Sequence, residues 1–192
     1  MASWYSTALV SSAFAAALWL TGCANKPPLP SYGVVPKFNF TDHTGAAFDS
    51  SAALDKKIWV ADFVFTNCPG PCPRMSSQMH QVQTALAAES DVRFVSFTVD
   101  PARDTPPVLA AYAQHFEATP GKWFFLTGDA ADLNRMSRGV FMLGDVDGSL
   151  QHSTRFALID RQSRIRGYYQ TSEQEAIPNL IADAKRLLKD SL

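Results

Sequence analysis

Two nearly continuous apolar runs of strand length lie in the middle of the chain, at residues 58–65 and 92–99. Runs of this kind are typical of central strands that are buried on both faces of a sheet. A shorter apolar run at 123–127 predicts a third strand. The runs at 155–160 and 164–169 flank a polar turn, which predicts a β-hairpin.

Helical periodicity follows the first two strands. Behind the first strand, four apolar residues recur at helical spacing: Met75, Met79, Val82 and Leu86. Behind the second, Thr105 is a suitable N-cap and Pro106 suits the first turn of a helix. The apolar face of that second helix is expected to consist of Val108, Leu109, Tyr112 and Phe116.

Two more helices complete the predicted order. Asp129 is a suitable cap for a helix that runs through Met136 and ends at Gly139. The last helix is expected from about Glu175 to the C-terminus, with Pro178 in its first turn. Alternation of strands and helices predicts an α/β fold with a central mixed sheet flanked by helices. The final hairpin and closing helix are typical of a thioredoxin-like fold.

The N-terminal segment has a different pattern. It carries no Lys, Arg, Asp or Glu before Lys26, and its apolar run from Ala8 to Leu20 is broken only by two serines. This run is shorter than the roughly 20 residues that cross a bilayer, so it predicts an export signal over residues 1–22, although one without the usual basic start. Leu20-Thr21-Gly22-Cys23 resembles the lipobox of bacterial lipoproteins. The resemblance implies cleavage before Cys23 and a lipid on that cysteine; an uncleaved anchor or a cytosolic apolar helix is the alternative.

A proline-rich stretch separates this signal from the rest of the chain. Four prolines fall between residues 25 and 36, a composition typical of an extended, semi-rigid spacer. We therefore expect a lipid-anchored tether at 23–36 and one folded domain at 37–192. The expected location is the bacterial cell envelope, anchored to the membrane and facing the periplasm or the extracytoplasmic side.

Composition narrows the class of protein further. The chain has 192 residues, of which 46% are hydrophobic and 18% are charged, and its net charge is −1. These values exclude a disordered tail and a polytopic membrane protein, and they argue against nucleic-acid binding. Three cysteines are too few for a disulfide scaffold, so their positions matter more than their number.

Cys68 and Cys72 are separated by Pro69, Gly70 and Pro71, in the predicted loop between a buried strand and a helix. Functional sites of α/β sheets form at this end of the strands. Because helix N-termini stabilise anions, we expect both thiols to be more acidic than the reference pKa of about 8.5. The pair could hold a metal with a third ligand, form a reversible disulfide, or form a structural one.

Four histidines are candidates for that third ligand. His43 lies in an expected turn, His80 lies on the helix after the cysteines, and His115 ends the next helix, so structural or surface roles are favoured for them. His152 lies in a polar loop before the hairpin, which approaches the cysteine loop in a thioredoxin-like arrangement. From its position alone it is either a metal ligand or an exposed loop histidine.

Three ordered segments together resemble the Sco/SenC family: the Cys-x-x-x-Cys-Pro loop at 65–73, a second block at 95–106, and a histidine segment at 151–160. The resemblance covers roughly residues 37–190. It implies a thioredoxin-like, membrane-tethered copper protein that helps assemble the CuA centre of cytochrome c oxidase.

The resemblance also implies which residues bind the metal. The copper ligands would be Cys68, Cys72 and His152, holding Cu(I), Cu(II) or both. The expected partner is the CuA-bearing subunit of the oxidase or another copper or redox protein. Gly70-Pro71 replaces the acidic residue often found between the cysteines, and the turn at 161–164 is more basic than is usual in the family. Asp100 and Arg103 are expected either to lie beside the copper ligands and support them, or to form a structural salt bridge.

Three functions remain open from the sequence. The first is a copper chaperone that passes metal to a partner. The second is a thiol–disulfide oxidoreductase, with Cys68 attacking and Cys72 resolving, and the third is a peroxidase-like relative of thioredoxin. His152 separates the first two, because a pure oxidoreductase does not need it.

Overall fold

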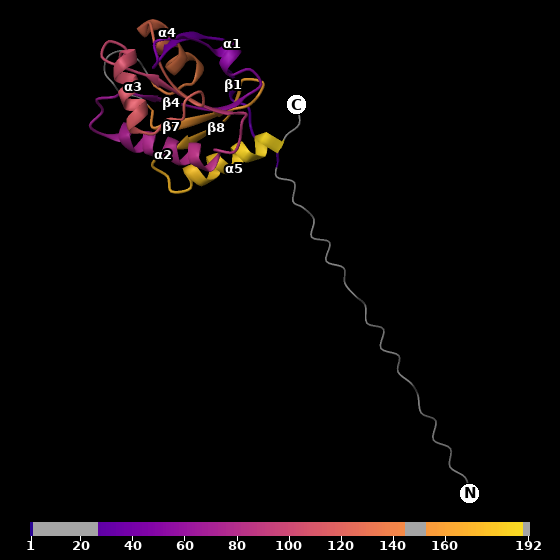
Figure 1. The fold of residues 1–192 in the computed structure, drawn as a ribbon. Helices are drawn as coiled ribbons and strands as arrows, with labels where there is room; N and C mark the ends of the chain where they lie inside the picture. Colours follow the sequence, from indigo (N-terminus) through magenta and orange to yellow (C-terminus); the bar gives the residue numbers. More distant parts are fainter. Residues whose placement is uncertain (2–26, 145–152, 190–192) are drawn as a thin grey trace.

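The computed structural model describes residue 1 and residues 27–144 and 153–189, which form an eight-stranded mixed sheet with helices on both faces (Figure 1). The strands are β1 (Gly33–Val34), β2 (Asn39–Asp42), β3 (Ala47–Asp49), β4 (Ile58–Val64), β5 (Val92–Thr98), β6 (Trp123–Thr127), β7 (Arg155–Ile159) and β8 (Arg164–Gln170). The helices are α1 (Ser50–Ala53), α2 (Pro71–Ala85), α3 (Pro106–His115), α4 (Ala130–Asn134), the π-helix η1 (Arg135–Val140) and α5 (Ala176–Lys189).

The strand order across the sheet is β1-β8-β7-β4-β5-β6-β2-β3. The three central strands β4, β5 and β6 are parallel, whereas β7 and β8 form an antiparallel hairpin beside β4. All seven residues of β4 are buried, as the continuous apolar run predicts for a strand covered on both faces. This mixed sheet confirms the fold class expected from the sequence.

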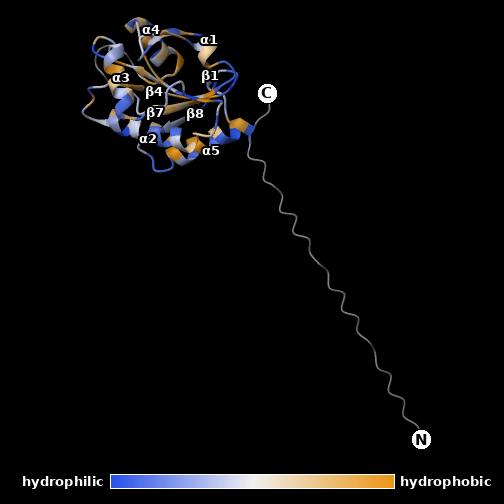
Figure 2. Ribbon diagram, viewed as in Figure 1, coloured by the Kyte–Doolittle hydropathy of each residue, from blue (hydrophilic) through white to orange (hydrophobic). Residues whose placement is uncertain are grey.

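Two hydrophobic clusters fill the space on either side of the sheet. On one face, α2, α3 and α5 pack through residues such as Met79, Leu109 and Leu180. On the other, α1, α4 and η1 enclose an aromatic cluster that includes Phe63, Phe97 and Phe141. Figure 2 shows α5 as a ribbon of mixed hydrophobic and hydrophilic colour, which suits a helix with one face on the sheet.

Most of the predicted elements agree with the structure, with three differences. Val108 is 40% exposed and does not belong to the buried face of α3, so that expectation is wrong. The Asp129 cap is present, since its carboxylate accepts from the N–H groups of Ala131 and Asp132, but the helix continues past Gly139 as the wider η1. The short strands β1, β2 and β3 carry too few residues for a periodicity to be read.

Among the described residues, no helix is long and apolar enough to cross a membrane.

Candidate metal centre

The cysteine loop joins the end of β4 to the start of α2. Cys68 lies in the loop, and Cys72 occupies the first turn of α2, whose first residue is Pro71. A proline at this position favours the start of a helix because it lacks an N–H that would have no partner there. The loop therefore lies at the carboxyl end of the central parallel strand, where α/β sheets place their sites.

Both cysteines of the loop are free thiols, and they contact one another. Cys68 is half-buried and packs against the aromatic cluster, whereas Cys72 is fully buried. The Cys68 side chain lies close enough to the Cys72 sulfur to raise the pKa of that thiol. Two soft sulfur donors are thus already adjacent in the folded protein.

Burial raises the pKa of the Cys72 thiol well above its usual value, and the neighbouring Cys68 side chain and the charge of Asp62 raise it further, while the Phe65 backbone offsets only part of the rise. The expectation that both thiols would be acidic is therefore wrong for Cys72. The loss of water around its sulfur outweighs the favourable field of the helix N-terminus. Any metal that binds Cys72 as a thiolate must displace this proton.

A buried acid lies on β4, six residues before Cys68. Asp62 is 0% exposed, and neither of its carboxylate oxygens has a hydrogen-bond partner of good geometry within the described part of the chain. Burial raises its pKa to about 7, and the nearby Ser96 hydroxyl offsets only part of this effect. Burial raises the pKa of Tyr112, whose hydroxyl lies 3.0 Å from the Ser76 Oγ on α2, and the charge of Asp62 adds a smaller contribution. Asp62 therefore affects the electrostatics of the cysteine site without being exposed to solvent.

Asp104 holds the start of the cysteine loop. Its carboxylate accepts from the Thr66 backbone N–H at 3.2 Å, from the Thr66 Oγ1 at 2.6 Å, and from the Thr98 Oγ1 at 2.5 Å. Thr66 is two residues before Cys68, and Thr98 ends the neighbouring strand β5. This buried carboxylate thus ties the loop to the adjacent strand end, and charged acceptors make strong hydrogen bonds.

Sequence reasoning singled out Asp100 and Arg103 and missed Asp104. Arg103 Nη1 lies 2.7 Å from Asp100 Oδ2, and the arginine side chain is 70% exposed. These two residues therefore form a salt bridge between an exposed guanidinium and a buried carboxylate. The sequence did hold a signal for Asp104. Thr66 follows β4 and Thr98 ends the adjacent strand β5, so both hydroxyls need a hydrogen-bond acceptor at this end of the sheet.

Two of the expected site residues, His152 and Cys23, lie outside the described residues. Ser153 follows His152 in the sequence, and its N–H donates to the Leu143 carbonyl at 2.8 Å. β7 begins shortly after it and runs antiparallel to β4, so β7 starts at the sheet end that carries the cysteines. Across residues 27–144 and 153–189, no three His, Cys, Asp or Glu side chains are grouped to hold a metal.

The other three histidines have structural surroundings. His43 Nδ1 accepts from the Phe125 N–H at 3.3 Å, and burial lowers the pKa of its ring. His80 Nδ1 lies 3.1 Å from the Phe116 carbonyl oxygen, so it donates there. His115 ends α3, as expected, where a cation suits the helix dipole.

The chemistry of the described site rests on its two sulfurs. Thiolates are soft ligands that suit Cu(I). Two adjacent free thiols can also be oxidised together to a disulfide, which would remove them as metal ligands. The geometry therefore suits metal binding and thiol exchange, and oxidation would switch off the first.

Comparisons with known proteins agree with this arrangement. The chain is 31% identical to an SCO1 protein homolog from Bacillus subtilis over 88% of its length and 90% of the relative. It is also 31% identical to a putative copper-binding protein from Stutzerimonas stutzeri, over 76% of the chain and 73% of the relative.

Solved structures match over most of the chain. A SCO1/SenC family lipoprotein from Bacillus anthracis has 35% identity and a TM-score of 0.75, over 85% of this chain and 99% of that one. BsSco, a member of the Sco family of cytochrome c oxidase assembly proteins in which a disulfide switch is identified, has 27% identity and a TM-score of 0.73, with the same coverage. The family model SCO1/SenC matches residues 27–189. The protein thus has a thioredoxin-like sheet with two adjacent thiols at the carboxyl ends of its parallel strands, and the family model covers nearly all of the described residues. The chain belongs to the SCO1/SenC family.

Proposed function

We propose that this protein is a membrane-tethered copper chaperone, which delivers copper to the CuA site of cytochrome c oxidase, reduces the cysteines of that site, or does both. The observation that carries the proposal is the contact between the free thiols of Cys68 and Cys72 at the carboxyl end of β4. A relative described as copper-binding and a neighbour from a family of oxidase assembly proteins support the metal and the partner.

The proposed copper ligands are Cys68, Cys72 and His152. Two thiolates and one imidazole suit Cu(I) in a near-trigonal arrangement, and Cu(II) would take a further ligand. Since burial raises the pKa of Cys72, copper loading releases the proton of that thiol. Apparent copper affinity should therefore rise with pH.

The proposed location is the bacterial cell envelope, on the periplasmic or extracytoplasmic side. A signal at residues 1–22 would be removed, and a lipid on Cys23 would anchor the tether. The lipoprotein of the same family from Bacillus anthracis supports this anchor. A thiol pair in such a compartment can be oxidised, so a reducing partner is needed before copper is loaded.

The second candidate is a thiol–disulfide oxidoreductase without a stable metal role. The observation that favours it is again the adjacent, free thiol pair. Cys68, the more accessible sulfur, would attack the partner's disulfide, and Cys72 would resolve the mixed disulfide. Both electrons would come from the two thiols, which end as a disulfide.

A Cu(I) competition titration with a chromophoric chelator separates the two functions. We expect the reduced protein to bind one Cu(I), and Cys68→Ser or His152→Ala to weaken binding by at least tenfold. His152→Ala should still reduce an oxidised CuA-domain peptide, because exchange needs only the thiols. A reduced protein that binds no Cu(I) would refute the chaperone proposal. Unchanged affinity in Cys68→Ser would refute the ligand set.

A further inference from the structure

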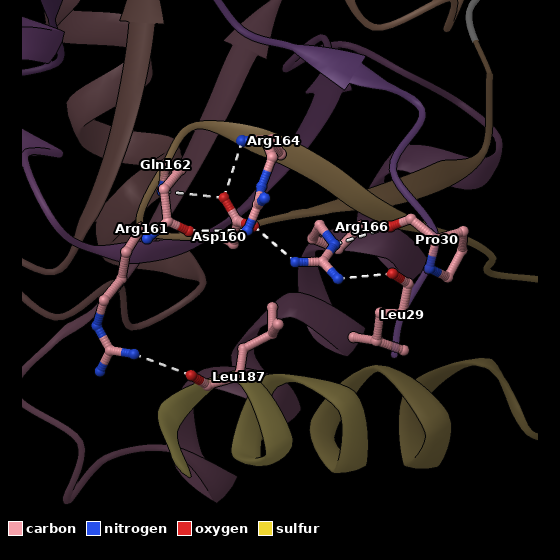
Figure 3. Close-up of polar contacts among 8 residues, drawn as sticks. All are labelled: Leu29, Pro30, Asp160, Arg161, Gln162, Arg164, Arg166 and Leu187. Atoms are coloured by element: carbon pink, nitrogen blue, oxygen red, sulfur yellow. Dashed lines mark hydrogen bonds and ion pairs between the residues drawn. The ribbon is translucent and has the colours of Figure 1, made fainter. Parts of the chain in front are cut away.

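Most of the proline-rich segment is docked on the domain instead of extending from it. Arg166 on β8 donates to the Leu29 carbonyl at 2.6 Å through Nη2 and to the Pro30 carbonyl at 2.8 Å through Nε (Figure 3). Leu29 packs against the cluster under α2, α3 and α5. The Tyr32 N–H then donates to the Ile165 carbonyl, and β1 pairs with β8. We call residues 27–35 the strap.

A buried carboxylate holds Arg166 in place. Arg166 Nη1 donates to Asp160 Oδ2 at 2.8 Å, and both side chains are largely buried, at 11% and 4% exposed. Asp160 also accepts from the backbone N–H groups of Gln162 and Arg164 at 2.9 Å each (Figure 3). Burial opposes the charged form of Asp160, but these hydrogen bonds outweigh it and keep its pKa below the usual value. The guanidinium is therefore rigidly oriented toward the strap.

The strap starts at the end of the domain that is opposite to the cysteines. Arg186, in the last turn of α5, donates to the Pro27 carbonyl, and the indigo start of the strap lies beside the yellow end of α5 in Figure 1. The turn between β7 and β8 lies at this same end, since Arg161 Nη1 donates to the Leu187 carbonyl at 2.9 Å. Between this end and the cysteine loop lies the length of β4, seven residues or about 20 Å.

Exposed lysines gather at the strap end. Lys37, Lys56 and Arg161 line one hollow, and Lys185 and Lys189 belong to the last turns of α5. All four lysines are exposed. We call Lys37, Lys56, Lys185 and Lys189 the anchor-end lysines.

The acids at this end offset only part of this charge. Asp55 is exposed and Glu89 is half-buried, whereas Asp91 is paired with Lys57 at 2.8 Å and Asp160 with Arg164 and Arg166. Lys122, whose Nζ donates to the Glu89 carbonyl, and Arg93, which donates to the Ser90 carbonyl, add two more cations at this end. Asp190 follows Lys189 in the sequence. The whole chain has a net charge of −1, so positive charge at one end means that the charge is segregated.

We propose that the strap end, with the anchor-end lysines, rests on anionic lipid headgroups, and that the strap holds the domain there with its cysteine end turned away from the bilayer. The orientation rests on the proposed lipid at Cys23. From Cys23 to the first docked residue, Pro27, the chain can span at most about 14 Å. The exposed Tyr32 and Val34 of the strap add an aromatic and an apolar contact, which suit a membrane interface.

Vesicle sedimentation with residues 27–192 tests the proposal without the lipid. Both hydrophobic clusters of the described structure are built within residues 29–188, so this piece keeps that entire core. We expect it to bind phosphatidylglycerol-containing vesicles, to bind pure phosphatidylcholine vesicles much less, and to be released by salt. Equal binding to both kinds of vesicle, or to neither, would overturn the proposal.

A matched pair of double variants tests the place of contact. Lys185→Gln with Lys189→Gln should lower the vesicle partition coefficient by at least tenfold, at roughly fivefold per lysine. Arg74→Gln with Arg103→Gln removes the same charge from the cysteine end and should change it by less than about twofold. Equal losses from both pairs would show binding through net charge alone and would overturn the proposal. The lysine variant should bind Cu(I) like the parent, so this result is separable from the copper proposal.

Discussion

Asp62 is a fully buried acid on the central strand, and its carboxylate has no hydrogen-bond partner of good geometry among the described residues. The sequence around Asp62 has the pattern of an apolar strand, so it does not predict the raised pKa of this carboxyl group. Cys72 behaves in the same way, since burial and not its place at a helix N-terminus sets the direction of its pKa. At the residue scale, the environment of each titratable group decides its protonation.

Asp62→Asn should remove a pH dependence of stability. The pKa of Asp62 is about 7 in the folded protein and 3.8 in the reference state, so the folded form binds the proton more tightly. Stability conferred by this proton is present below about pH 4 and is lost as the pH rises through 7. We expect the Asp62→Asn variant to be more stable than the parent at pH 8, by roughly 2–4 kcal/mol, and similar to it at pH 4.

Urea unfolding between pH 4 and 8.5 measures this difference. Asp91→Asn is the matched control, because Asp91 is a partly exposed acid whose pairing with Lys57 lowers its pKa. The control should keep the slope of the parent between pH 5 and 8. An Asp62→Asn protein with the parent's slope over that range would contradict the assignment of the buried charge.

At the scale of elements, the strap and the β7–β8 hairpin form one unit. From the sequence, the turn at 161–164 was notable only because it is more basic than is usual in the family. In the structure, Arg164 and Arg166 converge on Asp160, and Arg166 continues to the strap carbonyls. The basic residues of this hairpin thus have a role in docking the N-terminal segment.

Arg166→Gln should loosen the strap and leave the rest of the domain folded. The change removes both hydrogen bonds to the strap carbonyls, each worth about 1.5–3 kcal/mol for a charged donor. We expect amide hydrogen exchange at Tyr32 and Val35 to rise by at least tenfold, because these N–H groups hold the strap to β8 and its turn. NMR or mass spectrometry measures this exchange.

Arg164→Gln is the control for the strap. Arg164 contacts Asp160 and Gln162 with a side chain that is 44% exposed, so its polar contacts within the described chain stay inside the hairpin. Exchange at Tyr32 and Val35 should then stay near the parent value. Equal acceleration by both variants would mean that the hairpin, and not Arg166, secures the strap.

At the scale of the whole molecule, the sheet separates two ends with different tasks. The parallel strands deliver the cysteine loop to one end, and the antiparallel hairpin returns the chain to the other, where the strap docks. A ligand that binds only the folded state stabilises it through mass action. Copper should therefore stabilise the entire domain from one end.

Cu(I) at about 100 times its dissociation constant should raise the midpoint of thermal unfolding by about 5–10 °C, which corresponds to ~2.7 kcal/mol for a chain of this size. Differential scanning calorimetry under reducing conditions measures the shift. Cys68→Ser with Cys72→Ser should abolish it, while Lys185→Gln with Lys189→Gln should preserve it. A shift that survives the loss of both thiols would place copper elsewhere.

The sequence by itself determined the order of the strands and helices from β4 onward, the position of the cysteine pair in a strand–helix loop, and the family. Local patterns carry these features, since apolar runs, caps and spacing act within a few residues along the chain. Only the tertiary structure decided the raised pKa of Cys72, the burial of the Asp62 carboxylate without a described hydrogen-bond partner, the hydrogen bond between Asp104 and Thr66, and the docking of the strap. Each depends on burial or on partners far apart in the sequence, as with Arg166 and Leu29, which are separated by 137 positions and joined by one hydrogen bond.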